Sequence, residues 1–214
     1  MRLADGRSRD GSAPATPHAT RHAGRPIRFG REDALMARVA VVYGTSEGQT
    51  ATVAKRVADT LAEAGHEATL LHAQHLPSGF AVDAFDAVVV GASVHMGSHQ
   101  AYVARFVREH VSSLDDRPSA FFSVSLTAAE GTETARETAR GLLDDFLADT
   151  GWEPDVTAVF PGALKYSEYG LLTRFVMKRI ARKYGGDTDA SRDYEYTDWD
   201  AVERFAGDVA ALLA

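Results

Sequence analysis

Hydroxyl side chains gather in one short loop, and their types and spacing suit the binding of an anion. Residues 45–50 have the sequence T-S-E-G-Q-T, with hydroxyls at Thr45, Ser46 and Thr50. Apolar residues recur at helical spacing from Val53 onward, so the loop leads into a predicted helix. The first N–H groups of a helix lack partners and carry a partial positive charge. The loop is therefore a candidate phosphate site.

Known nucleotide-binding patterns restrict the class of ligand that this loop could bind. It lacks G-x-x-x-x-G-K-[ST], so no lysine is placed to reach a triphosphate, and it lacks G-x-G-x-x-G, which disfavours a dinucleotide. A single phosphate monoester held by hydroxyls and backbone amides fits better. The alternative is a strand–helix turn without a ligand, because Ser and Thr are ordinary helix N-caps.

Alternating strands and helices must position this loop. The apolar patterns predict strands at 39–43, 67–72, 85–92, 119–124 and 156–161. They predict helices directly after the loop, at 98–113, at 132–150, at about 170–184 and from 197 or 198 onward.

Alternation of this kind specifies an α/β protein with right-handed crossovers. We predict a flavodoxin-like, doubly wound sheet of five parallel strands in the order 2-1-3-4-5, with an extra basic helix before the last helix. Ligands of such sheets bind beyond the carboxyl ends of the strands. The loops 44–50, 92–99 and 125–132 should therefore surround the site.

The first 35 residues differ from the rest. Their seven arginines and four acidic residues give a net charge of +3, which leaves −10 for residues 36–214. Because the segment is rich in Gly, Pro, Ser, Thr and Ala and has no apolar period, we expect it to be disordered. Met36 directly precedes the first strand, so a wrongly assigned start is the favoured explanation. The folded flavodoxin-like domain is expected at 36–214.

Composition excludes several functions. The chain has no cysteine, so thiol nucleophiles, disulfides and Cys-ligated metals are ruled out, and its histidines form no metal-ligand pattern. An acidic domain lacks the basic footprint of a nucleic-acid-binding protein. No apolar run reaches the length of about 18 residues that indicates a membrane span.

Several segments resemble the menaquinone-dependent protoporphyrinogen IX dehydrogenases of the flavodoxin family. The loop 45–50 matches the family's FMN-phosphate pattern of hydroxyl, any, hydroxyl or acid, Gly, any, Thr. Further similar segments are 91–94 (G-A-S-V), 118–124 (P-S-A-F-F-S-V), 161–166 (P-G-A-L-K-Y), 185–189 (G-G-D-T-D) and 196–199 (Y-T-D-W). The resemblance covers about 39–214, and simple flavodoxins have nothing comparable between the fifth strand and the last helix.

The resemblance implies FMN-dependent oxidation of protoporphyrinogen IX to protoporphyrin IX in heme biosynthesis, with electrons passing to a membrane quinone. It implies a cytoplasmic protein attached peripherally to the inner face of the cell membrane. The FMN-binding residues that it implies are Thr45, Ser46, Glu47, Gly48, Gln49, Thr50, Ser93, Val94, His95, Met96, Gly97, Ser125, Leu126 and Thr127. Because Met96 cannot stack on the flavin as a tyrosine would, His99, Tyr166 or Tyr169 are the candidates for that contact.

Flavin chemistry belongs to the cofactor, so no catalytic triad is expected. His95 and His99 flank Gly97 and are candidates for proton exchange near neutral pH, with ordinary loop histidines as the alternative.

The predicted helix at 170–184 has a basic side opposite an apolar one. Its cations are Arg174, Lys178, Arg179, Arg182 and Lys183. Such a helix suits a membrane surface or the propionates of a porphyrinogen. The alternative is a core-packed helix whose solvated face is basic.

Two further functions stay open. A flavodoxin acting as a soluble electron carrier needs only the five-strand unit and not the basic segment. An NAD(P)H:quinone oxidoreductase is a third possibility, although the sequence has no nicotinamide signature.

Overall fold

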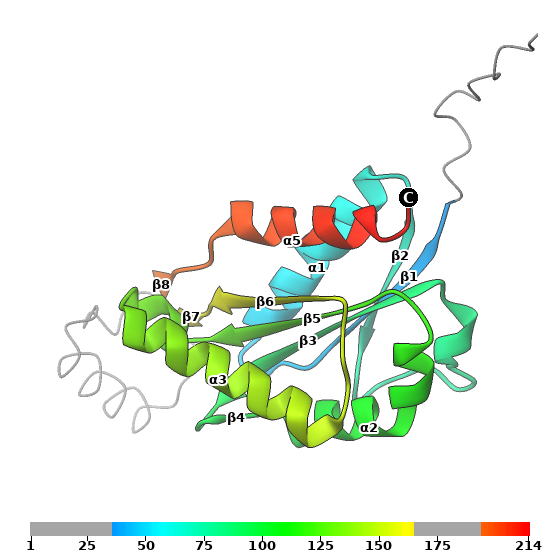
Figure 1. The fold of residues 1–214 in the computed structure, drawn as a ribbon. Helices are drawn as coiled ribbons and strands as arrows, with labels where there is room; N and C mark the ends of the chain where they lie inside the picture. The colour runs from blue at the N-terminus through cyan, green and yellow to red at the C-terminus, as the bar shows by residue number, and fades with distance from the viewer. Residues whose placement is uncertain (1–35, 165–193) are drawn as a thin grey trace, which may run out of the picture. The chain divides into compact units, whose positions relative to one another are not determined.

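A parallel sheet lies at the centre of the described part of the chain, residues 36–164 and 194–214 of the computed structural model (Figure 1). Its long strands are β1 (Arg38–Tyr43), β2 (Glu67–His72), β3 (Ala87–His95), β5 (Ser119–Ser125) and β6 (Val156–Pro161). They pair in parallel in the order β2-β1-β3-β5-β6. Counted without the short β4 (Ser98–His99), this is the predicted order 2-1-3-4-5, so the fold prediction is confirmed.

The apolar runs explain which strands occupy the centre. β1, β3 and β5 are almost continuously buried, as expected for parallel strands covered on both faces. In β1 the four residues from Val39 to Val42 are completely inaccessible to solvent. β2 and β6 lie at the two edges and are only partly buried.

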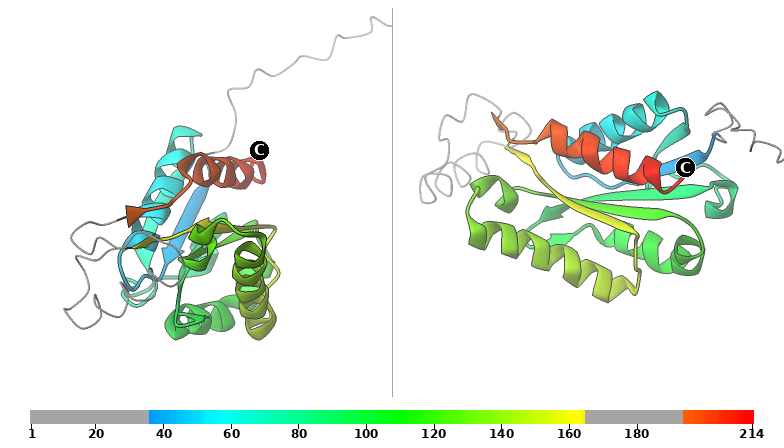
Figure 2. Two further views of the ribbon diagram at one scale, coloured as in Figure 1. Left: turned by 90° about the vertical axis from the view of Figure 1, so that its left-hand side faces the viewer. Right: turned by 45° about the horizontal axis from the view of Figure 1, so that its top comes forward.

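Helices cover both faces of the sheet (Figure 2). α1 (Gln49–Glu63) and α5 (Trp199–Ala211) pack on one face, and α2 (Ala101–Asp115) and α3 (Glu133–Thr150) pack on the other. Single turns of 3-10 helix, η1 (Val82–Ala84) and η2 (Thr127–Glu130), lie in the connections. The N-caps of α3 and α5 are Thr132 and Asp198, where the sequence predicted these helices to begin.

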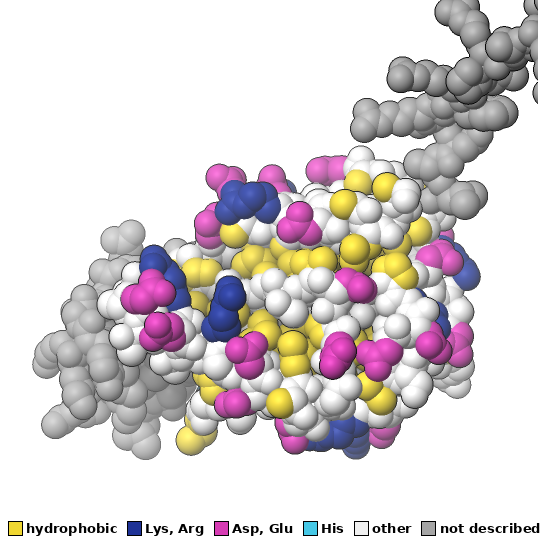
Figure 3. All heavy atoms as spheres, in the orientation of Figure 1, with side chains coloured by type: hydrophobic (Ala, Val, Ile, Leu, Met, Phe, Trp, Pro, Cys, Tyr) yellow, Lys and Arg dark blue, Asp and Glu magenta, His cyan; other side chains and the backbone are white. Residues whose placement is uncertain are grey.

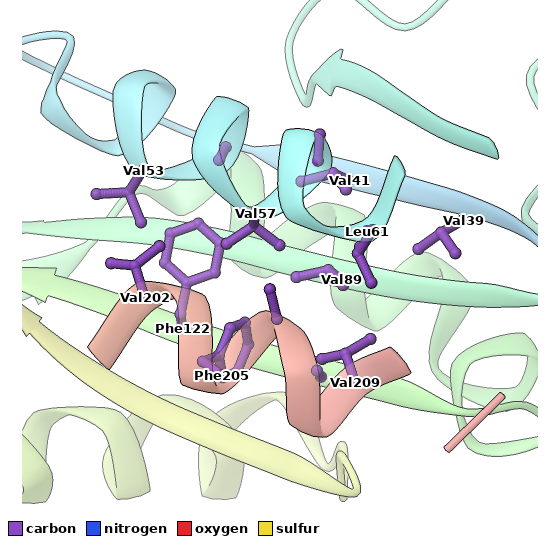
Figure 4. Close-up of a cluster of buried hydrophobic side chains, with 14 of the residues drawn as sticks. Val39, Val41, Val53, Val57, Leu61, Val89, Phe122, Val202, Phe205 and Val209 are labelled. Carbon is purple, nitrogen blue, oxygen red and sulfur yellow. The ribbon is translucent and has the colours of Figure 1, made fainter. Parts of the chain in front are cut away.

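Figure 4 shows the core under α1 and α5. Val53, Val57 and Leu61 of α1, which the helical period predicted to share a face, are completely buried there. They meet Phe205 of α5 and Phe122 of β5. On the opposite face the stacked rings of Phe121 and Phe146 form a second cluster with Trp152.

The segment after β3 differs from its prediction. The helix was expected to begin at residue 98, but Ser98 and His99 form β4, which pairs antiparallel with the end of β3, and α2 begins at Ala101. Met96 and Gly97, at the turn, both have positive φ, 51° and 82°. Two such residues are typical of a type I′ hairpin turn, which extends β3 to His95.

A second, two-stranded sheet follows the large one in the chain. β7 (Ala163–Leu164) pairs antiparallel with β8 (Tyr194–Glu195), and no sequence signal predicted it. The predicted basic helix at 170–184 and the predicted disordered segment 1–35 lie outside the described residues.

Candidate functional site

One pocket collects the loops at the carboxyl ends of the central strands. It contains about 360 Å³ of empty space, part of it open to solvent. Its lining residues are Thr45, Ser46, Glu47, Gln49, Thr50, Ser93, Val94, His95, Val124, Leu126 and Gly162. The three loops chosen from the sequence all contribute to it, as the topology of a doubly wound sheet requires.

The first loop is held in shape by its own hydrogen bonds. Gly48 is the N-cap of α1 and adopts the left-handed region with φ of 81°, where a side chain would be strained. Its backbone N–H donates to Thr45 Oγ1 at 2.9 Å. The hydroxyl oxygen of Thr45 therefore has a structural partner inside the loop.

Thr50 differs from Thr45 in this respect. Among the described residues, the side-chain oxygens of Thr50 and Ser125 are fully buried without a hydrogen-bond partner. Thr50 lies in the first turn of α1 and lines the pocket. Because an unpaired buried hydroxyl costs about 1–3 kcal/mol, such a group at a ligand site indicates a missing acceptor. A phosphate at the helix N-terminus would supply that acceptor.

α2 contacts the first loop through Tyr102. The Thr45 N–H donates to the Tyr102 hydroxyl at 3.0 Å, and that hydroxyl donates to the Thr45 carbonyl at 3.3 Å. Burial raises the pKa of the Tyr102 phenol, although its bond with Thr45 acts in the opposite direction. Gly44 makes this contact possible, because a Cβ there would lie 2.3 Å from Val103 Cγ2.

Gln100 joins the first and second loops, and sequence reasoning missed it. Its Oε1 accepts from the Ser93 N–H at 3.1 Å, and its Nε2 donates to the hydroxyls of Ser93 and Ser46. Gln100 could have been recognised as the residue directly before a helix. The helix was predicted to begin at residue 98, however, which placed Gln100 inside it.

The two candidate histidines lie in different environments. His95 lines the pocket, and its Nδ1 lies 3.8 Å from Oε1 of Glu47. His99 instead packs edge-on against Phe121 and Phe146, and its Nε2 shares a hydrogen bond of 2.8 Å with Ser123 Oγ. Burial lowers the pKa of His99 to about 4. The position of His95 therefore suits proton exchange at the pocket better than that of His99.

Some of the other predicted site residues line the pocket and others do not. Ser93, Val94 and Leu126 line the pocket, whereas Met96 and Gly97 form the hairpin turn and Thr127 begins η2. The side chain of Met96 is 93% exposed.

Two pocket residues, Val124 and Gly162, were not predicted as site residues. Gly162 directly follows β6, and its N–H donates to the Ser125 carbonyl at 3.0 Å, which brings the end of β6 to the third loop. The signal for Gly162 was its place after the fifth strand.

Gln49 lies at the boundary between the pocket and the C-terminal part of the chain. It lines the pocket, but its Nε2 donates to Thr197 Oγ1 at 2.8 Å. The Thr197 hydroxyl donates onward to the Pro161 carbonyl at 3.1 Å. The Gln49 side chain thus ties the first loop to the segment before α5.

The remaining predicted residues follow β7 in the chain. Tyr166 and Tyr169, and the cations Arg174, Lys178, Arg179, Arg182 and Lys183, lie outside the described residues. Among the helices within 36–164 and 194–214, none has the length and apolar character needed to cross a bilayer.

The chain is similar in sequence to a family model and to named proteins. A family model described as "Flavodoxin domain" matches residues 40–191. The protoporphyrinogen IX dehydrogenase (quinone) of Escherichia coli strain K12 is 34% identical over 172 residues, which are 80% of this chain and 94% of that protein. The protein of the same name from Leishmania major is also 34% identical over 172 residues, covering 80% of this chain and 74% of its own.

Solved structures show the same fold. A short-chain flavodoxin associated with a non-canonical PDU bacterial microcompartment superposes with a TM-score of 0.53. The superposition covers 84% of this chain and 100% of the flavodoxin, at 15% sequence identity. At that identity the likeness concerns the fold alone.

Proposed function

Because this chain belongs to the flavodoxin family, we propose that it binds FMN and oxidises protoporphyrinogen IX to protoporphyrin IX, with a membrane quinone as the electron acceptor. Relatives that carry the name protoporphyrinogen IX dehydrogenase (quinone) support the substrate and the acceptor. Each pair of hydrogens that leaves the porphyrinogen reduces one quinone to a quinol, so the reaction balances without another oxidant. This activity would serve heme biosynthesis.

The cofactor assignment rests on the Thr50 hydroxyl, which is buried and has no partner within the part of the chain that the structure describes. Thr50 lies in the first turn of α1 and lines the pocket, so its hydroxyl would donate to the FMN phosphate at the helix N-terminus. The hydroxyls of Ser46 and Ser93 would add donors nearby. Gly48 would bring its backbone close to the phosphate, because it carries no side chain. Ser125, which was also predicted to bind FMN, ends β5 and does not line the pocket, although its buried hydroxyl has no partner among the described residues.

FMN, when bound, supplies the electron-accepting ring, and the protein supplies position and proton traffic. The His95 imidazole lines the pocket and has a half-exposed side chain, with the Glu47 carboxylate beside it. A histidine in that position can take a proton from the pocket and release it to water. We assign this proton-exchange role to His95 in preference to His99, which packs edge-on against Phe121 and Phe146.

The sequence also supports a peripheral place at the inner face of the cell membrane. The cations between residues 174 and 183 are concentrated in an otherwise acidic chain. Anionic headgroups and porphyrinogen propionates are both partners for such cations. A quinone dissolved in the bilayer would then lie within reach of the site.

An assay of porphyrin formation tests the proposal. The purified chain, saturated with FMN, is supplied anaerobically with protoporphyrinogen IX and a menaquinone analogue, and protoporphyrin fluorescence is followed. We expect fluorescence to rise beyond the amount that the bound FMN alone can accept only when FMN and quinone are both present. An electron carrier would bind FMN but give no porphyrin above the rate without protein, and that result would contradict the proposal.

A further inference from the structure

We propose that Gln100 is a positioning residue that fixes the first and second loops relative to each other and prepares Ser46 and Ser93 to donate to the cofactor. This inference rests on the proposed binding of FMN. The side-chain amide of Gln100 makes three contacts at once: it accepts from the Ser93 N–H and donates to the hydroxyls of Ser93 and Ser46. Ser46 and Ser93 both line the pocket.

The backbone of Gln100 is well placed for this task. Gln100 is the N-cap residue of α2, and its carbonyl accepts from the N–H groups of Val103 at 3.0 Å and Ala104 at 3.2 Å. An N-cap side chain ordinarily accepts from the first turn of its own helix, but the Gln100 side chain makes no such bond. It reaches back to the two loops instead. The amide is thus held by the helix and directed at the site.

The direction of the hydrogen bonds determines the chemistry. An amide nitrogen can only donate, so the oxygens of Ser46 and Ser93 act as acceptors toward Gln100. Each serine therefore keeps its own proton for another acceptor. In the pocket, the phosphate or the ring oxygens of FMN are acceptors of the required kind. Gln100 would thereby orient two donors before the cofactor arrives, which lowers the cost of ordering them on binding.

Two substitutions at residue 100 separate the parts of this role. Gln100→Ala removes all three bonds. Gln100→Glu keeps an oxygen that can accept from the Ser93 N–H but cannot donate to the serines, and it adds a negative charge beside the phosphate loop. Thr132→Ala is the matched control, because Thr132 is the N-cap of α3 and its side chain accepts from the Ala135 N–H at 3.2 Å, away from the pocket.

The first measurement is hydrogen exchange of the Ser93 amide in the FMN-free protein. We expect faster exchange in Gln100→Ala, and exchange close to wild type in Gln100→Glu and Thr132→Ala. This readout does not depend on the cofactor. Unchanged Ser93 exchange in Gln100→Ala would overturn the bridging role, whether or not the chain binds FMN.

The second measurement is the Kd of FMN, from the quenching of its fluorescence. We expect Gln100→Ala to weaken binding by about tenfold, as for the loss of net hydrogen bonds. Gln100→Glu should weaken binding further, and Thr132→Ala should lower the melting temperature without changing Kd. Wild-type affinity in both Gln100 variants would overturn the inference. If the wild-type chain itself fails to bind FMN, the proposed function is wrong, and Ser93 exchange alone decides whether Gln100 bridges the loops.

Discussion

Thr45 and Thr50 have the same side chain but differ in their hydrogen bonding. The Thr45 oxygen accepts from the Gly48 N–H inside the loop, whereas the Thr50 oxygen is buried and unpaired among the described residues. Removing a hydroxyl that stabilises its own loop should lower the stability of the protein. Removing a hydroxyl that binds a ligand should instead lower the affinity for that ligand. The pair therefore provides an internal comparison.

We predict that Thr50→Val leaves the FMN-free protein as stable as wild type or more stable by about 1 kcal/mol, because it removes an unsatisfied hydroxyl. It should weaken FMN binding by about tenfold or more, since a bond to a charged acceptor is worth about 1.5–3 kcal/mol. Thr45→Val should instead lower stability by about 1 kcal/mol. Urea unfolding without FMN and fluorescence titration with FMN measure both. Equal losses of stability in the two variants, with FMN affinity kept, would place the phosphate elsewhere.

His99 links stability to pH. Its folded pKa of about 4 lies below the usual 6.5, so between these values the unfolded chain binds a proton that the folded chain does not. The stabilising contribution of His99 to the free energy of unfolding is complete above pH 6.5 and is lost as the pH falls toward 4. Because one pH unit corresponds to about 1.4 kcal/mol, the loss is on the order of 3 kcal/mol.

Urea unfolding at several pH values between 7 and 4 tests this link. The decrease in unfolding free energy should be smaller in His99→Gln than in wild type. Ser123→Ala is the control, because it removes the hydrogen-bond partner of His99 but keeps the titrating imidazole. It should lower stability at every pH and keep the wild-type slope. A slope that does not change in His99→Gln would show that other groups cause the acid sensitivity.

At the scale of elements, the connection between β2 and β3 depends on Arg117, which lies between α2 and β5. The Arg117 Nη1 donates to the carbonyls of Val82 at 3.0 Å and Phe85 at 2.8 Å. Its Nη2 contacts the Asp83 carboxylate at 2.6 Å, and its Nε donates to the Ser113 carbonyl. Only 15% of the Arg117 side chain is exposed. One guanidinium thus satisfies the backbone of η1 and of the last turn of α2.

Arg117→Met should keep the packing of the aliphatic stem but leave these carbonyls unpaired. We expect a loss of about 2–3 kcal/mol in the free energy of unfolding, measured with urea. The matched control is Arg105→Met, which removes a mostly exposed arginine of α2 that is paired with Glu109, and it should cost less than about 1 kcal/mol. Similar losses in both variants would mean that the carbonyl contacts of Arg117 contribute little.

The elements that the sequence predicted well are those with local signals. Apolar runs located β1 and β5 to within about a residue, because a strand buried on both faces must be continuously apolar. The partly buried edge strands β2 and β6 were also located from their short apolar runs. The hairpin after β3 was missed, because its turn begins with Met96, and asparagine or aspartate is the usual signal at that place. The helix was consequently predicted three residues too early.

The candidate site was predictable where it depended on topology and not where it depended on side-chain contacts. The sheet order placed the loops at one edge of the sheet, which brought Thr45, Thr50 and His95 together. The bond between Gln100 and Ser46 joins residues 54 positions apart and has no pattern in the sequence. His99 was proposed for the site because of its position in the loop, yet the hairpin turns it toward Phe121 and Phe146.

At the scale of the whole molecule, charge is unevenly distributed along the chain. The described surface carries Asp and Glu side chains spread over the face in Figure 3, with Lys and Arg among them. Residues 174–183 hold five cations. A basic segment in an acidic protein favours contact with an anionic membrane, where each cation contributes about 1 kcal/mol.

Charge reversal tests this contact. Replacing Arg174, Lys178 and Arg182 by Glu should weaken binding to anionic vesicles and lower quinone-coupled activity, with FMN content unchanged. The control reverses the same amount of charge on exposed arginines of α2, α3 and α5, namely Arg105, Arg136 and Arg204. Co-sedimentation with vesicles compares the two triple variants. Equal weakening in both would indicate a response to net charge and not to residues 174–183.

Direct reduction of the bound flavin by the porphyrinogen tests the central claim. The FMN-loaded chain is mixed with protoporphyrinogen IX without oxygen or quinone, and the absorbance of oxidised flavin and of protoporphyrin is recorded together. The account predicts that flavin absorbance falls as protoporphyrin appears, and that a menaquinone analogue then restores the flavin absorbance. A flavin that stays oxidised in the presence of porphyrinogen, but is reduced by dithionite, would contradict the account and favour an electron carrier.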